Sequence, residues 1–136
     1  MSDNTQRSTQ LNRALHPDLV IRYVDDVPAS RRFYAGLLGR EPFLEQDGFA
    51  MFKFDSGLRL GLWARQAVQP APLAGGGGAE LAILVPDADA VHALHRDWRE
   101  RGVPIAQEPV TLDFGRTFVG TDPDGHRIRV YAFAAQ

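Results

Sequence analysis

The strongest constraint on the fold is an internal repeat in the order of the expected elements. An apolar run at 19–24 is followed by a helical segment that ends at Gly39. The same order recurs with an apolar run at 80–85 and a helical segment that ends at Gly102. The two glycines lie 63 positions apart, and short apolar stretches separated by turn residues follow each helix. This spacing predicts two copies of a strand–helix–three-strand (βαβββ) module.

Local signals set the expected boundaries of these elements. Asp25 and Asp26 before Pro28 predict the start of the first helix, and Asp87 and Asp89 predict the start of the second. A glycine after the last periodic residue is typical of a helix end. The strands expected after the two helices are 42–46, 49–54 and 58–64 in the first copy, and 104–110, 113–121 and 126–133 in the second.

The chain divides into a tail, two modules and a linker. Residues 1–15 are polar and are expected to form a frayed tail. Residues 66–78 are rich in proline and glycine, which is typical of a linker. The modules are then 16–65 and 79–136. Each should form a curved sheet with one helix on its outer face, so we expect an α+β fold in which two sheets face each other across a cleft.

Composition excludes several classes of function. The formal net charge is −2, which argues against an electrostatic grip on nucleic acid. The chain has no cysteine, so disulfides and thiolate chemistry are excluded. There is no apolar run of about 18 residues that would cross a membrane, and the polar first residues lack the apolar core of a signal peptide. We therefore expect a protein of the cytoplasm with small-molecule partners.

Two motifs resemble those of the vicinal oxygen chelate superfamily, which includes glyoxalases, bleomycin-resistance proteins and extradiol dioxygenases. The segment from Val24 to Tyr34, followed by Leu38-Gly39, resembles the first strand–helix motif of that family. The turn at 122–126 resembles its second marker, and together the motifs span about residues 17–133. The resemblance implies the glyoxalase/bleomycin-resistance fold. It also implies a homodimer in which two chains exchange modules.

The resemblance also places the metal ligands of the metal-dependent members at three positions of this chain, namely Leu19, Glu80 and Arg129. A leucine side chain has no lone pair to donate, and a guanidinium is a permanent cation without an acceptor atom. One carboxylate is too few for a metal site. The sequence therefore predicts no metal and no cofactor, and it argues against dioxygenase, glyoxalase and thiol-transfer chemistry by the metal route.

Strand alternation assigns side chains to the cleft. Trp63 and Tyr23 are the predicted stacking contacts for a flat ligand, because a ring between two rings gains burial and favourable geometry. Two partners are predicted for Arg129, a ligand carboxylate or Glu80, and the sequence does not decide between them. The full predicted set of ligand-binding residues is Trp63, Tyr23, Arg129, Glu80, Phe52, Phe114 and Tyr131.

The functional prediction is a non-catalytic binding protein. The segments 114–118 and 122–130 resemble those of superfamily members that bind planar aromatic antibiotics of the phenazine type and leave them unaltered. This implies antibiotic resistance by sequestration. One alternative is a metal-independent isomerase or hydrolase of a small aromatic substrate, with Glu80 as general base and Tyr23 or Arg129 stabilising charge. Another is an interaction domain whose cleft is filled by its own side chains.

Overall fold

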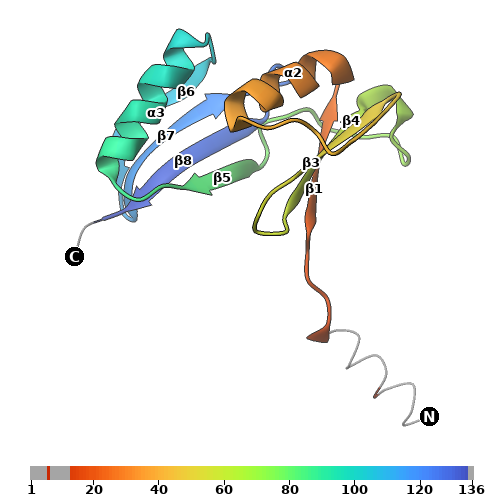
Figure 1. Cartoon of the computed structure of the whole chain (residues 1–136), viewed down its shortest axis with the longest axis horizontal. Coiled ribbons are helices and arrows are strands. Elements are labelled where there is room, and N and C mark those ends of the chain that lie inside the picture. Colours follow the sequence, from red (N-terminus) through yellow and green to blue (C-terminus); the bar gives the residue numbers. More distant parts are fainter. Residues whose placement is uncertain (1–5, 7–12, 135–136) are drawn as a thin grey trace.

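The computed structural model describes residue 6 and residues 13–134 (Figure 1), so the predicted tail at 1–15 lies mostly outside the described residues. The first module contains β1 (Leu19–Val24), α2 (Val27–Leu38), β2 (Leu44–Gln46), β3 (Phe49–Lys53) and β4 (Arg59–Ala64), and a short 3-10 helix, η1 (Arg65–Ala67), follows it. The second contains β5 (Glu80–Leu84), α3 (Ala88–Glu100), β6 (Ile105–Leu112), β7 (Gly115–Thr121) and β8 (Arg127–Phe133). Neither α2 nor α3 has the length and apolar character needed to cross a membrane.

Each module contains one four-stranded mixed sheet. The strand orders are β1-β4-β3-β2 and β5-β8-β7-β6. In each sheet the first strand pairs in parallel with the last, and the remaining neighbours are antiparallel. A parallel pair needs a long crossover connection, which the helix of each module supplies. The predicted α+β fold of two βαβββ modules is confirmed.

The helix starts follow from capping side chains. The Asp26 carboxylate accepts a hydrogen bond from the Ala29 backbone N–H at 3.0 Å, and Asp87 accepts one from Ala90 at 2.9 Å. Each cap satisfies a backbone donor that has no partner within the helix. Gly39 ends α2 with φ 64°, a left-handed conformation that glycine adopts without steric cost. The acidic residues before each helix therefore act as the sequence predicts.

The core lies between each sheet and its helix. In β8, Ile128 and Val130 are fully buried beneath α3, whereas Arg129 and Tyr131 lie on the opposite face and are only partly buried. Trp98 of α3 packs edge-on against a buried phenylalanine of β7, with 5.0 Å between the ring centroids. Alternation along the strands thus separates a dry face under the helix from an open face.

Polar contacts between the β7–β8 turn and α2 join the two modules. The Tyr34 hydroxyl donates to Asp122 Oδ2 at 2.7 Å, and both residues are buried. The Asp124 carboxylate accepts from the Asp25 backbone N–H at 2.9 Å and from the Ser30 hydroxyl at 3.3 Å. These bonds hold the second module against the start of α2 and fix the orientation of the two modules relative to each other.

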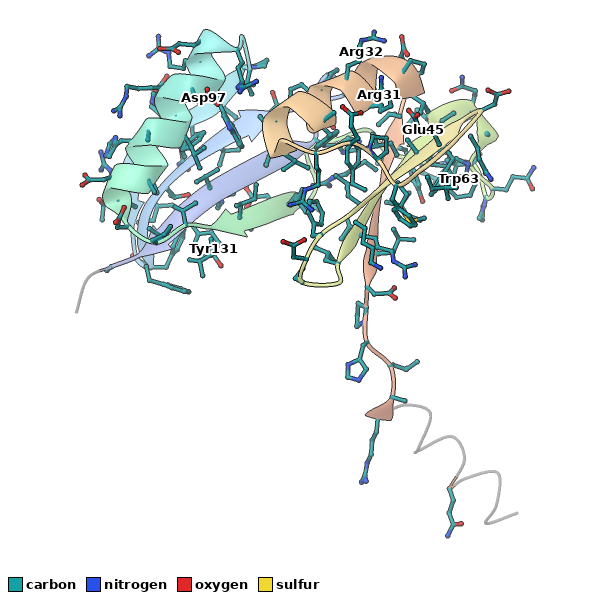
Figure 2. The ribbon with its side chains drawn as sticks, in the orientation of Figure 1. Arg31, Arg32, Glu45, Trp63, Asp97 and Tyr131 are labelled. Carbon is teal, nitrogen blue, oxygen red and sulfur yellow. The ribbon has the colours of Figure 1, made fainter. Side chains whose placement is uncertain are left out.

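Within a single chain the two sheets do not face each other across a cleft, so the predicted cleft needs the exchange of modules between two chains that the family resemblance implies. The helix α2 packs on the first sheet and contacts the turn of the second module, so it lies between the two sheets (Figure 1). Figure 2 shows Trp63 on the outer side of the first module and Tyr131 beneath the second sheet, far from each other. Each sheet consequently keeps an uncovered face of its own.

Candidate functional site

The first open face is the surface of β1, β4 and β3 that α2 does not cover. Tyr23 and Trp63 are direct register partners on β1 and β4. Their rings meet edge to face, with centroids 6.4 Å apart and planes at 74°. Both side chains are partly exposed. The structure therefore brings together the two residues that were predicted to contact the ring faces of a ligand.

Phe52 must be corrected, because it is fully buried in the core and cannot reach a ligand on the open face. Alternation in β3 instead places Phe49 and Met51 on the first open face, opposite Trp63 and Gly61 in register. Neither residue belongs to the predicted ligand-binding set. Residues 49–52 read Phe-Ala-Met-Phe, so both faces of this strand carry large side chains. Alternation alone therefore does not show which face the helix covers.

Gly61 leaves room at the middle of the first open face. A Cβ atom there would lie 3.1 Å from the ring of Phe49 and 3.5 Å from a methyl carbon of Leu19. The Phe49 ring therefore leans across β4 where that strand has no side chain. Together with Leu19, Ile21 and Trp63, it makes an apolar surface that no helix or strand among residues 13–134 covers.

The second open face is the uncovered surface of β5, β8 and β7. Here Tyr131 packs edge-on against both Phe114 and Phe133, with centroid separations of 5.9 and 5.5 Å. These rings, Ala82 and Arg129 line an open pocket of about 260 Å³. The structure thus brings Phe114, Tyr131 and Arg129 together as predicted. It adds Phe133, which alternation from Tyr131 indicates but which was not singled out.

Glu80 and Arg129 form a bidentate ion pair on the second open face. Arg129 Nε donates to one carboxylate oxygen at 2.8 Å and Nη2 donates to the other at 2.9 Å. Arg127 Nη2 lies 2.9 Å from the same carboxylate. Arg129 Nη1 also donates to the side-chain oxygens of Gln107 and Thr117. Of the two partners left open for Arg129, the structure supplies Glu80.

This arrangement does not fit a metal at the position that the family resemblance implies. Leu19 provides no donor atom. The Glu80 carboxylate is already bound by two guanidinium groups, and Arg129 adds a permanent positive charge. Within residues 13–134, no group of three or more histidine, cysteine or acidic side chains is placed to hold a metal ion.

We therefore predict that the purified protein carries no stoichiometric transition metal. The donor atoms that a divalent ion requires are missing at two of the three implied positions. Elemental analysis by mass spectrometry measures this directly. About one zinc, iron or manganese per chain, removable by a chelator with loss of ligand binding, would contradict the prediction.

The electrostatics of Glu80 follow from the same contacts. Hydrogen bonds from Arg129, followed by the charges of Arg129 and Arg127, hold the pKa of the Glu80 carboxyl below its usual value despite partial burial. A carboxylate with a lowered pKa contributes stability above its unfolded-state pKa and loses it as the pH falls through the folded-state value. The group is also a weak base, since its proton affinity is reduced.

Glu80→Gln should consequently destabilise the fold in a pH-dependent way. We expect a loss of about 1 kcal/mol at pH 7, because charge-assisted hydrogen bonds to two arginines are weakened. The difference from the wild type should shrink as the pH falls below 4.5, the unperturbed pKa. Urea denaturation at several pH values measures it, with the exposed Glu100→Gln as control. A difference that grows on acidification would contradict this sign.

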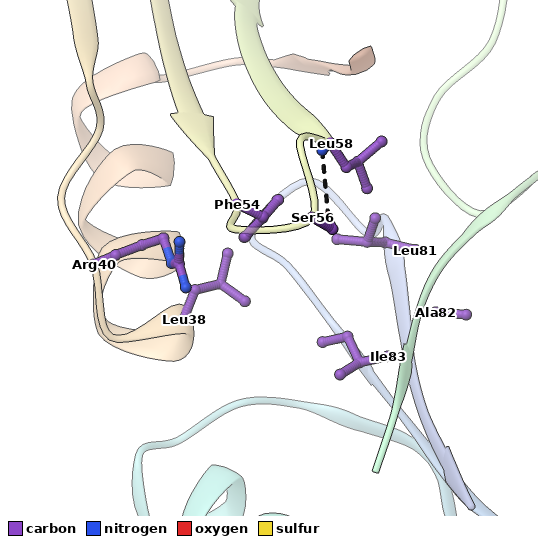
Figure 3. Close-up of a pocket in the computed structure, with 8 residues that line it drawn as sticks. All are labelled: Leu38, Arg40, Phe54, Ser56, Leu58, Leu81, Ala82 and Ile83. Atoms are coloured by element: carbon purple, nitrogen blue, oxygen red, sulfur yellow. Dashed lines mark hydrogen bonds between the residues drawn. The ribbon is translucent and has the colours of Figure 1, made fainter. Parts of the chain in front are cut away.

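A further pocket lies at the junction of the modules and was not predicted. It has a volume of about 310 Å³ and opens between the end of α2, the β3–β4 turn and β5 (Figure 3). Leu38, Phe54, Leu81 and Ile83 supply apolar walls, and Arg40 is held over the Phe54 ring at 5.0 Å. None of the residues predicted to bind a ligand lines it, but Ala82 of β5 lines both this pocket and the pocket on the second open face.

Comparison with known proteins supports the fold and identifies the family. The model of the Glyoxalase/Bleomycin resistance protein/Dioxygenase superfamily matches residues 16–130. The chain belongs to this superfamily. A curated superfamily relative, the phenazine antibiotic resistance protein EhpR of Enterobacter agglomerans, is 30% identical over 119 residues, which cover 84% of this chain and 89% of that protein.

Solved structures support the same fold. The solution structure of a protein from Agrobacterium tumefaciens is 45% identical, with a TM-score of 0.83 over 89% of this chain and 99% of that one. A glyoxalase-related enzyme from Fulvimarina pelagi matches with a TM-score of 0.77 at 21% identity, over 86% of this chain and 87% of its own. The second likeness supports the fold alone.

Proposed function

We propose that this protein binds a planar aromatic compound of the phenazine class and holds it without chemical change. The observation that carries the proposal is the set of partly exposed rings on the two open faces, Tyr23 with Trp63 and Phe114 with Tyr131. Rings that stand uncovered in water gain burial when a flat molecule lies against them, and each well-placed aromatic pair adds about 0.5–1.5 kcal/mol. The 30% identity to a phenazine resistance protein supports the same ligand class.

The chemistry of the open faces favours sequestration over catalysis. Glu80 is the carboxylate that an enzyme of this architecture would use as general base, but two arginines bind it and lower its pKa. The phenol of Tyr34 is buried and donates to Asp122, away from both open faces. The metal-independent isomerase or hydrolase is therefore the weaker hypothesis, although the same experiment tests it.

The experiment follows the ligand through a binding cycle. The protein is incubated with phenazine-1-carboxylic acid at equal concentrations, separated from free ligand, and denatured to release what it holds. Liquid chromatography with mass spectrometry should recover the compound with its mass and retention time unaltered. A product that accumulates with time in proportion to protein would establish the enzyme hypothesis instead. No retained compound would reject the ligand class.

We also propose that two copies of the chain form the complete cleft. Neither open face has a second layer in the part of the chain that the structure describes, and a half-covered sheet needs one. Because the first and second open faces of one chain diverge, a cleft with two walls requires the first face of one copy and the second face of another. The family resemblance implies this exchange of modules, and the apolar Leu19, Ile21 and Leu84 on these faces support it.

A mixed dimer tests this arrangement. Trp63→Ala weakens the first face and Ala82→Trp blocks the second, so homodimers of either variant should bind ligand at least about tenfold more weakly than the wild type. Dimers refolded from an equal mixture should regain one working cleft in each heterodimer, because one chain then provides an intact first face and the other an intact second face. Heterodimers isolated through different affinity tags should bind one ligand per dimer. Absence of any restored binding, or a monomer by light scattering, would contradict the proposal.

A further inference from the structure

A pocket beside the first open face contains Arg65, whose guanidinium pairs with no other side chain among residues 13–134. The segment 70–79 passes along β1 and encloses a volume of about 590 Å³, which Tyr23 and Ile21 line from the strand and Arg65 lines from η1. Arg65 directly follows the end of β4, two residues after Trp63, and it lines the same pocket as Tyr23. Arg65 is thus a cation that shares this pocket with one of the two predicted stacking residues.

The charge around Arg65 favours an anion. The one hydrogen bond of its side chain in the described part of the chain runs from Nη2 to the Ala74 carbonyl at 2.9 Å. None of the ion pairs among residues 13–134 involves it. The lining of this pocket contains no aspartate or glutamate, but it does contain Arg22 and His126. A guanidinium with free donors, beside a ring and without a carboxylate partner, is suited to binding a carboxylate in two parallel hydrogen bonds.

Two acidic residues lie in a neighbouring pocket and must be considered. Arg65 also lines a space of about 350 Å³ that includes Asp25 and Asp124. The Asp124 oxygens already accept from the Asp25 backbone and from Ser30. Neither acid comes within ion-pair distance of Arg65, so its charge is still available to a ligand.

Arg129 contrasts with Arg65 because its donors are already bound by other side chains. Its Nε and Nη2 are bound to Glu80, and its Nη1 is bound to Gln107 and Thr117. A ligand carboxylate at Arg129 would have to displace Glu80, a bidentate partner of the same chemistry. The sequence leaves two partners open for Arg129, a ligand carboxylate or Glu80, and the structure pairs it with Glu80.

We infer that Arg65, and not Arg129, selects ligands that carry an acid group. This inference rests on the proposed binding of a planar aromatic compound, and it adds the substrate class, a flat aromatic carboxylate whose ring lies against Trp63 and Tyr23. In this arrangement Arg129 and Glu80 form a wall of the second face, and their charges compensate each other.

The test compares two probes of the same shape, phenazine-1-carboxylic acid and phenazine-1-carboxamide, by equilibrium dialysis. The wild type should bind the acid about tenfold more tightly than the amide. Arg65→Gln should remove that preference by weakening the acid alone, and Arg65→Lys should restore part of it. Arg129→Gln should keep the preference, whatever it does to overall affinity. The exposed Arg96→Gln serves as the matched control and should behave as the wild type.

The outcomes distinguish the role of Arg65 from the proposed binding of planar aromatic compounds. Equal affinity of the wild type for acid and amide would overturn the role of Arg65 while leaving planar aromatic binding intact. If the preference for the acid over the amide persists in Arg65→Gln and disappears in Arg129→Gln, then Arg129 is the residue that recognises the acid group. Binding of neither probe by the wild type would reject the proposed function itself.

Discussion

Replacing Trp63 with alanine should weaken binding of a flat aromatic ligand by about tenfold to a hundredfold. The indole is partly exposed on the first open face and braced edge-on by Tyr23. Removing it deletes one face of the stack and about 1–3 kcal/mol of burial. Because the ring is not part of the buried core, the free energy of unfolding should change little. Equilibrium dialysis and urea denaturation measure the two quantities on the same sample.

The second tryptophan provides a matched control. Trp98 is 2% exposed and packs in the core against a buried phenylalanine. Trp98→Phe should lower stability without changing affinity, which is the opposite pattern from Trp63→Ala. If Trp63→Ala destabilises the fold and leaves affinity intact, Trp63 is a packing residue and the first open face is not the ligand surface.

Asp122→Ala should destabilise the protein by about 3 kcal/mol. The carboxylate is 3% exposed, and it accepts hydrogen bonds from the backbone N–H groups of Asp124 and His126 and from the Tyr34 hydroxyl, all at 2.7–2.9 Å. Burial, reinforced by the Asp122 charge, raises the pKa of Tyr34 and keeps its hydroxyl a donor. Without the acceptor, a buried hydroxyl and two amides lose their partner, and hydrogen bonds to charged groups are worth about 1.5–3 kcal/mol each.

A double-mutant cycle with Tyr34→Phe isolates the bond between the modules. The two substitutions should be less than additive, because each removes the same hydrogen bond. Asp113→Ala, which changes an exposed aspartate on the β6–β7 turn, should have almost no effect. A loss below about 1 kcal/mol for Asp122→Ala would mean that this network does not hold the two modules together.

Local features of the fold could be predicted because local chemistry decides them. The strand at 19–24 and the helix starts after Asp26 and Asp87 depend on an apolar run and a capping carboxylate, and both lie within a few residues of what they determine. The open-face positions of Tyr23, Trp63 and Tyr131 follow from alternation once one residue of each strand is placed.

What could not be predicted depends on contacts between distant residues. The assignment of Phe52 needed the pairing of β3 with β4, since Phe49 and Phe52 are equally large and have opposite parity. The divergence of the two open faces is fixed by bonds such as Tyr34 to Asp122, which are 88 positions apart in the sequence. The choice between Glu80 and a ligand as the partner of Arg129, which the sequence leaves open, is also made by a contact that spans 49 positions. No local sequence pattern encodes contacts between residues this far apart in the chain.

The central claim, that the uncovered aromatic faces bind a planar compound, is tested most directly by calorimetric titration of the wild-type protein with phenazine-1-carboxylic acid. We predict saturable binding with one ligand per chain, and a negative heat-capacity change because apolar surface is buried. Absence of saturable heat at protein concentrations of about 100 µM, where even weak binding is detected, would contradict the account.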